Sequence, residues 1–437
     1  MEAVAVVLFA LFVALCLRVL ARTRSVSVLL LLILSYNYLL HGYVVVFFYE
    51  ALGYSLGDYW YDGFPYFISY DHHYWGAAVV SLLFANTYLL VWSILPLREH
   101  RLHKMQDDTL HLRGWPLLIL GVGTFVIGIL PWIDFVLTYL RSGESAYLAF
   151  KSGEQLGAYV GLLKWMLSIT SMSLCILFVA GIGLSNRLVI PTGRLFAIFW
   201  ALVIISGVLL FGSMMALGDR VTLLEGGLAA VVLASFRGIR SARAIFLVLL
   251  FVVPLIAIGV FREAKESAGP SELLSEAVGQ IVVNAESRTA FSQYIVMSNR
   301  IEPYPGGSLT YLTQIMLPRF WAEDRPEEGP YEHYAAAAGL PARLGWGINL
   351  MTDCYMNYGL GATVVAALLL GALHWGAFRF ACVSVTGQFV FSGLVAAYPI
   401  SIRSGIPGLK GMVMGMGLGY LLCIVSCKRG VRMTMRS

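Results

Sequence analysis

Arginine outnumbers lysine in the parts of the chain that the charge pattern, set out below, assigns to the outer side of a membrane. The guanidinium group carries a rigid fork of donors that matches phosphate oxygens, and it is less strongly hydrated than an ammonium group. A set of arginines over a membrane cavity therefore suits a phosphate or pyrophosphate carried by a lipid. For any single arginine, the alternative is a contact with anionic headgroups or with an acid of the same loop. The basic residues concerned are Arg141, Arg220, Arg262, Arg288, Arg300, Arg319, Arg325, Arg343 and Arg403, beside Lys151, Lys265 and Lys410.

Four charged residues, Asp134, Lys164, Arg220 and Glu225, lie within or at the edge of apolar runs. Charge at membrane depth is costly and usually faces a cavity or a partner. Lys164 could instead extend its ammonium group to the headgroups, and Asp134 could cap a helix end after Pro131. Arg220 begins a short run interrupted by glycine, as in helices that are broken to build a site. All four lie toward the same side, which predicts a polar cavity that opens there.

Metal and cofactor chemistry find little support in the sequence. The six cysteines form no CxxC pair, so neither a disulfide framework nor a zinc site is indicated. Asp71-His72-His73 lacks further clustered ligands, and we predict no metal and no cofactor. The aromatic segment Phe47–Trp75 could stack on sugar rings, although an aromatic belt at the membrane interface is the commoner explanation.

The elements that must hold these residues are membrane helices. Of the 437 residues, 59% are hydrophobic and 13% are charged, and the mean hydropathy is +0.77, whereas soluble domains are about 25% charged. The repeated apolar runs do not alternate, which favours helices over a barrel. We therefore predict an all-α, polytopic integral membrane protein whose first run, Val4 to Leu20, is a retained helix rather than a signal peptide.

Basic residues orient the predicted helices. We expect about eleven crossings, and the connections after the odd-numbered ones are short and rich in Lys and Arg, which assigns them to the cytoplasm. The N-terminus is then outside and the C-terminus inside. The predicted parts are a first bundle of about eight helices over 1–261, an extracytoplasmic loop over 262–349, and about three last helices with a basic tail over 350–437. The predicted crossings are 3–20, 26–47, 74–96, 115–140, 157–184, 195–217, 221–236, 244–261, 350–376, 382–400 and 411–427.

The long loop is predicted to have structure of its own. Apolar residues recur at helical spacing between Ser271 and Ser298 after a Pro-Ser start signal, which predicts a helix on the membrane surface or over the mouth of the bundle. A second helix is predicted over Tyr331 to Ala338. Structured loops of this length are usually functional, and we expect Tyr311 to Pro326 to form a lid over the cavity.

The chain contains four short motifs in this order: Gly218-Asp219-Arg220; Pro318-Arg319-Phe320-Trp321 with Arg325-Pro326; Asp353-x-Tyr355-x-Asn357-Tyr358-Gly359; and Arg403-Ser404-Gly405. In order and spacing, these motifs resemble those of the O-antigen polymerase (Wzy-like) family of oligosaccharide repeat-unit polymerases. The predicted number of helices, the orientation and the late loop also agree with that family. Two positions depart from its pattern, because Asp353 stands where Glu is more frequent and Arg325 where Lys is common.

The resemblance implies a glycosyltransferase on the periplasmic face of the bacterial inner membrane. Its substrates would be oligosaccharide repeat units on undecaprenyl pyrophosphate, and the reaction would be metal-independent and inverting. A chain-length co-polymerase is a further partner that the family allows, whereas nucleic acid is not expected. The residues implied are Arg220, Arg288, Arg319 and Arg403 for the departing pyrophosphate, His333, Glu323 and Asp353 as candidates for the general base, and Trp321, Tyr355 and Asn357 for sugar.

Two other functions use similar residues. A ligase that moves a finished glycan from the same lipid to another acceptor needs the same donor chemistry. A non-enzymatic carrier of lipid-linked sugar or another anion is the alternative from a different class. Carriers usually have paired internal repeats and a site near the bilayer midplane, while this sequence shows no repeat and its charges lie toward one side.

Overall fold

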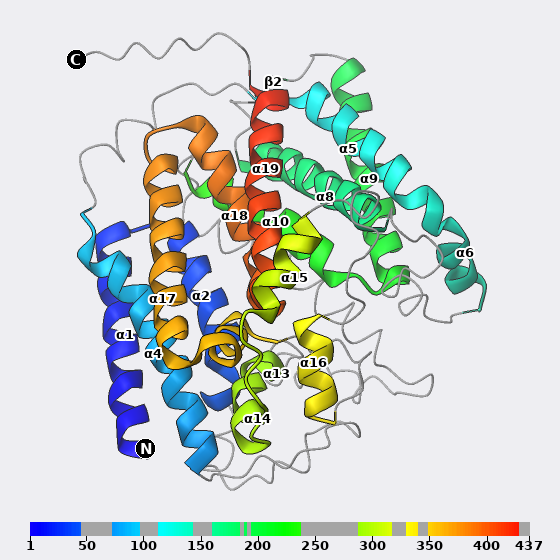
Figure 1. The fold of residues 1–437 in the computed structure, drawn as a ribbon. Helices are drawn as coiled ribbons and strands as arrows, with labels where there is room; N and C mark the ends of the chain where they lie inside the picture. The colour runs from blue at the N-terminus through cyan, green and yellow to red at the C-terminus, as the bar shows by residue number, and fades with distance from the viewer. Residues whose placement is uncertain are drawn as a thin grey trace, which may run out of the picture. The chain divides into compact units, whose positions relative to one another are not determined.

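The computed structural model describes residues 1–44, 72–96, 112–142, 160–183, 188–189, 194–236, 287–316, 329–339 and 348–427. Within these ranges the protein is mostly helical, with one short parallel pair of strands, β1 (Leu112–Arg113) and β2 (Leu188–Val189) (Figure 1). The same ranges contain 8 helices that are long and apolar enough to cross a membrane. The predicted class, an all-α polytopic membrane protein, is confirmed at this level.

Most predicted crossings coincide with a described helix. Two of them correspond to shorter helices, α2 (Val26–Leu39) and the 16-residue α10 (Arg220–Ser235). The crossing predicted at 244–261 lies outside the described residues. The long helices are α1 (Glu2–Thr23), α4 (His72–Ile94), α5 (Gly114–Ile129) continued by η4 (Leu130–Trp132) and α6 (Ile133–Ser142), α8 (Val160–Gly183), α9 (Arg194–Leu217), α17 (Leu350–Ala381), α18 (Val385–Arg403), and η8 (Ile406–Gly408) continued by α19 (Leu409–Ser426).

The chain divides into two compact units. Unit 1 comprises residues 1–97, 264–377 and 397–414, and unit 2 comprises 98–263, 378–396 and 415–437. Both units therefore draw on segments that are distant in the sequence, whereas the predicted parts follow the order of the chain.

In unit 1, α1 and α4 run in parallel and an arginine joins their ends. A Cβ atom on Gly76 would lie 3.8 Å from Met1 Cε, near the start of both helices. At the other end, Arg22 donates hydrogen bonds to the carbonyl oxygens of Trp92 (3.1 Å), Ser93 and Leu95 (3.0 Å). The last carbonyls of a helix lack partners within it and carry partial negative charge. Arg22 therefore caps α4 and fixes it to α1.

The helix α17 is interrupted where its sequence reads Tyr358-Gly359. Tyr358 has φ −146° and ψ 16°, and Gly359 has φ 71° and ψ −164°. Glycine adopts a positive φ at little cost because it has no Cβ atom. The predicted crossing at 350–376 is thus two helical pieces, and the short first piece carries Asp353 and Asn357.

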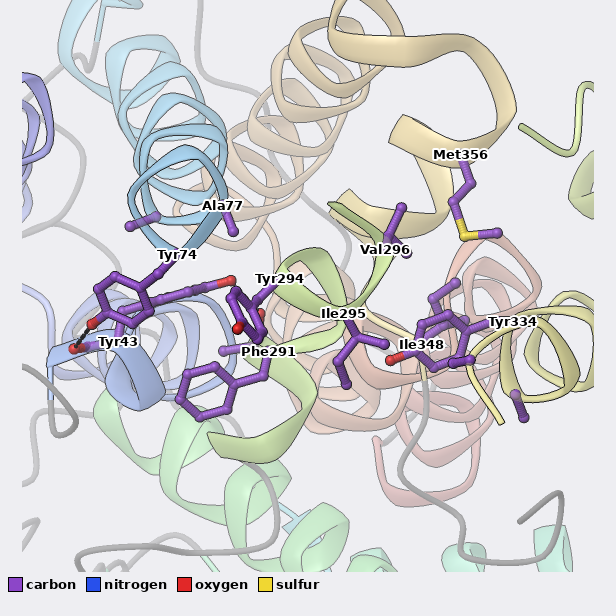
Figure 2. Close-up of a cluster of buried hydrophobic side chains, with 14 residues drawn as sticks. Tyr43, Tyr74, Ala77, Phe291, Tyr294, Ile295, Val296, Tyr334, Ile348 and Met356 are labelled. Carbon is purple, nitrogen blue, oxygen red and sulfur yellow. Dashed lines mark hydrogen bonds between the residues drawn. The ribbon is translucent and has the colours of Figure 1, made fainter. Parts of the chain in front are cut away.

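A buried aromatic cluster joins the loop helices of unit 1 to its long helices (Figure 2). The Tyr43 hydroxyl donates to the Ala290 carbonyl at 2.8 Å, and the Tyr74 hydroxyl donates to the Tyr43 carbonyl at 2.7 Å. The rings of Tyr43 and Phe291 meet edge to face with centroids 5.3 Å apart. The helices held here are α13 (Ser287–Ala290), α14 (Ser292–Ser298) and α16 (Pro330–Ala337).

These helices fall where the long loop was predicted to be helical. The described part of the predicted helix at 271–298 is α13 and α14, and its residues 271–286 lie outside the described ranges. The helix α16 confirms the second prediction. A third helix, α15 (Gly307–Met316), was not predicted, because that stretch was interpreted as the beginning of a lid.

In unit 2, α5, α8 and α10 pack closely. A Cβ atom on Gly226 of α10 would lie 2.7 Å from the carbonyl oxygen of Ser171 of α8, so the two backbones touch. Thr124 of α5 and Thr170 of α8 join their hydroxyl groups at 2.9 Å. The helices α8 and α10 begin at the same end of the unit, near the end of α5, where Gly128 approaches Leu167.

Candidate functional site

The carboxylate of Asp353 is the centre of a buried hydrogen-bond network in unit 1. Oδ1 accepts hydrogen bonds from the Ser308 hydroxyl and from Asn357 Nδ2 (2.9 Å), and Oδ2 accepts one from the backbone N–H of Ile406 (2.7 Å). The side chain of Asp353 is 1% exposed. A buried carboxylate is tolerated when its lone pairs are satisfied in this way. The network thereby joins the start of α15, the first piece of α17 and the turn before α19.

Asn357 closes the network from one turn further along α17. Its Nδ2 also donates to Ser308 Oγ (2.9 Å) and to the Asp353 carbonyl (2.8 Å), and its Oδ1 accepts from the Ser308 N–H (3.3 Å). The spacing of four residues places Asp353 and Asn357 on the same face of a helix. The structure shows the Asn357 amide occupied within the protein. The predicted sugar-binding role of Asn357 stays a prediction.

The turn between α18 and α19 depends on a glycine. Gly405 has φ 68°, and a Cβ atom there would lie 2.5 Å from Asp353 Oδ2. No other residue type would fit without moving the carboxylate. Ser404 forms a parallel bridge with Ile348, which joins the turn to the start of α17 a second time.

Arg403 ends α18 directly before this turn. Its side chain is half-buried, and a guanidinium in the last turn of a helix is favoured by the partial negative charge of the helix end. The predicted phosphate-binding role of Arg403 stays a prediction, and the bond from the Ile406 N–H to Asp353 fixes the backbone that follows it.

Lys410 holds the other end of α15. Its Nζ donates to the Ile315 carbonyl at 2.5 Å, one residue before α15 ends at Met316. The helix is therefore fixed at its start by Asp353, through Ser308, and near its end by Lys410. The chain continues from α15 toward Pro318-Arg319. Sequence reasoning missed this role of Lys410, because no signal in the sequence marks a contact between residues 95 positions apart.

His333 lies on α16 and stacks on a tyrosine. The rings of His333 and Tyr304 have centroids 4.5 Å apart and an interplanar angle of 20°. The Tyr304 N–H donates to the Met356 carbonyl at 2.9 Å, which ties this pair to α17. The buried Nε2 of His333 has no hydrogen-bond partner among the described residues. The ring is thus held firmly while one nitrogen retains its bonding capacity.

The remaining predicted residues of unit 1 and its loop are placed only in part. Tyr355 is half-buried and packs against the aromatic cluster. The backbone of Arg288 lies in α13. Three residues lie outside the described ranges, namely Arg319, Trp321 and Glu323.

Arg220 belongs to unit 2, where it begins α10. Gly218 has φ 65°, and Asp219 caps the helix by accepting from the N–H groups of Val221 (3.1 Å) and Thr222 (3.3 Å). A capping aspartate of this kind is typical of a helix start. The Gly-Asp-Arg motif is therefore a tight turn that presents a half-buried arginine at the end of the unit.

The network could have been partly recognised from sequence. Ser308 comes directly before an apolar run, and serine in that position is a start signal for a helix. The backbone N–H of Ile406 carries no signal in the sequence. Among the described residues, no group of three or more His, Cys, Asp and Glu could hold a metal ion. No family model, no curated protein and no solved structure matches the chain.

Proposed function

We propose that the protein is a glycosyltransferase that polymerises oligosaccharide repeat units carried on polyprenyl pyrophosphate, at the periplasmic face of the bacterial inner membrane. The observation that supports this most is the Asp353 network, because it joins two of the motifs that resemble the polymerase family. These are the Asp353–Asn357 motif and the turn after Arg403, and the same network also holds the start of α15 through Ser308. Motifs that are far apart in the sequence thus form one structural unit.

The reaction needs positive groups at the leaving pyrophosphate. As the bond from the anomeric carbon to phosphate breaks, negative charge develops on the departing oxygens, and preorganised donors at a low-dielectric boundary stabilise it strongly. Arg403 is the candidate whose side chain and adjacent turn are described in unit 1. Arg319 follows α15, whose two ends are fixed by Ser308 and Lys410. Arg288 belongs to the same proposed set, and a phosphate-binding role of Arg220, in unit 2, stays a prediction from the sequence.

The acceptor hydroxyl must also lose its proton. Both oxygens of Asp353 already accept hydrogen bonds inside the protein, so in this proposal Asp353 is a positioning residue rather than the base. His333 and Glu323 remain candidates from the sequence. Direct attack of the acceptor oxygen on the anomeric carbon would invert its configuration, and no metal is required when arginines neutralise the pyrophosphate.

The proposed topology has about eleven crossings, with the N-terminus in the periplasm and the C-terminus in the cytoplasm. Unit 1 supports it, because the ends predicted to face outward gather at one place. The end of α2, the start of α4 and the loop helices meet in the aromatic cluster, and the Asp353 network joins the start of α17 to the end of α18. The loop 262–349 would then lie over this end.

Deletion of the gene in its source bacterium tests the proposal through the surface glycan. A polymerase predicts that the ladder of chain lengths on a gel collapses to a core with one repeat, and that the wild-type gene restores the ladder while Arg319→Ala at equal expression does not. Loss of all surface repeats, with long chains accumulating on the lipid, would indicate a ligase instead. An unchanged ladder would contradict a role in that polysaccharide.

A further inference from the structure

The carboxyl group of Glu225 differs in its surroundings from that of Asp353. Glu225 lies on α10 in unit 2, and its Oε2 accepts a hydrogen bond from Ser168 Oγ of α8 at 2.6 Å. Its other oxygen, Oε1, accepts no hydrogen bond from the described residues, and this atom is not fully buried. A carboxylate that is held by one oxygen and open at the other suits a group that exchanges a proton.

The packing of α8 against α10 fixes where this side chain lies. The neighbouring Gly226 touches Ser171, since a Cβ atom at Gly226 would lie 2.1 Å from Ser171 Oγ. Glu225 therefore sits at the contact between the two helices and extends to Ser168, which is nearer the start of α8. An acidic residue retained in an apolar helix pair usually faces a polar ligand or a polar cavity.

The charged neighbours of Glu225 lie at the same end of unit 2. Arg220 precedes it by five residues, a rise of about 7.5 Å along the helix axis. Among the elements that pack together here, α5 carries no charged residue within its bounds and α9 carries only Arg194, at its opposite end. Among the described residues, the other titratable or charged groups at this end are Asp219, which caps α10, Lys164 on α8, and Asp134, Tyr139 and Arg141 on α6.

We propose that Glu225 takes the proton of the acceptor hydroxyl and that Ser168 holds the carboxylate in position, an inference that rests on the proposed glycosyl transfer. The acceptor oxygen forms a bond to the anomeric carbon. The bond from that carbon to the pyrophosphate oxygen breaks, and the pyrophosphate leaves with the electron pair. The hydroxyl proton passes to Oε1 of Glu225. Arg220, on the same helix, would stabilise the leaving group.

A carbodiimide tests the exposure of Glu225 without assuming any substrate. Dicyclohexylcarbodiimide is apolar and modifies protonated carboxyl groups in membranes. With the full-length protein in lipid vesicles at mildly acidic pH, mass spectrometry should find the adduct on Glu225 and not on Asp353, whose oxygens are both bonded. Absence of the adduct from Glu225 would overturn the proposal.

Single-turnover rates test the catalytic role. With a synthetic polyprenyl-pyrophosphate-linked repeat unit, Glu225→Gln should lower the rate about 100-fold or more while the dissociation constant of the donor stays unchanged. Ser168→Ala should lower the rate less and move the acidic limb of the pH–rate profile to higher pH, because the carboxylate loses a donor. Ser173→Ala, a buried serine further along α8, is the matched control and should do neither.

The outcomes separate this inference from the function on which it rests. If the wild-type protein forms glycosidic bonds and Glu225→Gln forms them equally fast, Glu225 is not the base and the proposed function stands. A rate that is lost in His333→Gln but kept in Glu225→Gln would likewise assign the role to His333. If the wild-type protein forms no bond, the proposed function itself fails, whatever the carbodiimide result.

Discussion

Asp353 Oδ2 accepts a hydrogen bond of 2.7 Å from the backbone N–H of Ile406, 53 residues further along the chain. This bond ties the first piece of α17 to the turn that follows Arg403. The other carboxylate oxygen holds Ser308 at the start of α15. One buried side chain thus sets the relative positions of two segments to which we assign pyrophosphate-binding residues.

Replacing Asp353 by alanine should destabilise unit 1. The Ser308 hydroxyl and the Ile406 N–H would lose their acceptor while still buried, and the Asn357 amide would lose one of its three acceptors, at a total cost of about 2–4 kcal/mol. Thermal unfolding of the purified protein in detergent would measure this as a lower apparent Tm. Ser404→Ala, which removes an exposed hydroxyl in the same turn, is the control. An unchanged Tm for Asp353→Ala would show that the network contributes little.

Gly405→Ala should lower the apparent Tm of the protein for two physical reasons. The alanine would have to keep φ 68° and ψ −155°, a region that is essentially restricted to glycine and costs other residues about 1–3 kcal/mol, and its Cβ would lie 2.5 Å from Asp353 Oδ2. The matched control is Gly361→Ala in α17, where nothing lies within 4 Å of the added atom. We expect Gly361→Ala to keep or raise the Tm because alanine favours a helix. An equal apparent Tm for Gly405→Ala and Gly361→Ala would contradict the described turn.

The long helices could be predicted from the sequence because apolar length is a local property. The predicted crossings at 74–96 and 195–217 match α4 and α9 closely. The break in α17 could not be predicted in the same way, since a glycine within an apolar run does not reveal its φ angle. The sequence identified Asp353 and Asn357 as site residues through their motif. It did not predict that they hold α15 and the turn after Arg403 in place.

The partners of Asp353 depend on tertiary packing, which a single sequence does not record. Ser308 and the N–H of Ile406 approach it from elements on either side in the chain. The role of Arg22 was missed for the same reason. Its charge marked a cytoplasmic loop in the sequence, and the structure shows that it also caps α4.

Arg22→Met should lower the stability of unit 1 by removing the cap of α4. Hydrogen bonds from a charged donor contribute about 1.5–3 kcal/mol, and the helix carbonyls at the end of α4 would be left to other partners. Arg18→Met removes an exposed charge one turn earlier in α1 and should leave the Tm near the wild-type value. The apparent Tm of both variants, measured side by side, checks this. A larger loss for Arg18→Met would contradict the assignment.

Arg403→Ala should weaken binding of a polyprenyl-pyrophosphate analogue at least about tenfold, or about 1.4 kcal/mol. Arg403→Lys should not restore binding, because an ammonium group cannot present the paired donors of a guanidinium. Arg379→Ala, which removes an exposed arginine near the end of α17, serves as the control for net charge. Isothermal titration calorimetry of the protein in nanodiscs would give the three dissociation constants. Full binding by the lysine variant would indicate a non-specific electrostatic contact.

The most direct measurement is an assay with purified full-length protein in lipid vesicles and a fluorescent repeat unit linked to polyprenyl pyrophosphate. A polymerase should give a ladder of products that carry two or more repeats, formed together with free polyprenyl pyrophosphate and absent with Arg319→Ala. Movement of the fluorescent lipid across the membrane without any new glycosidic bond would contradict the proposed function and establish a carrier.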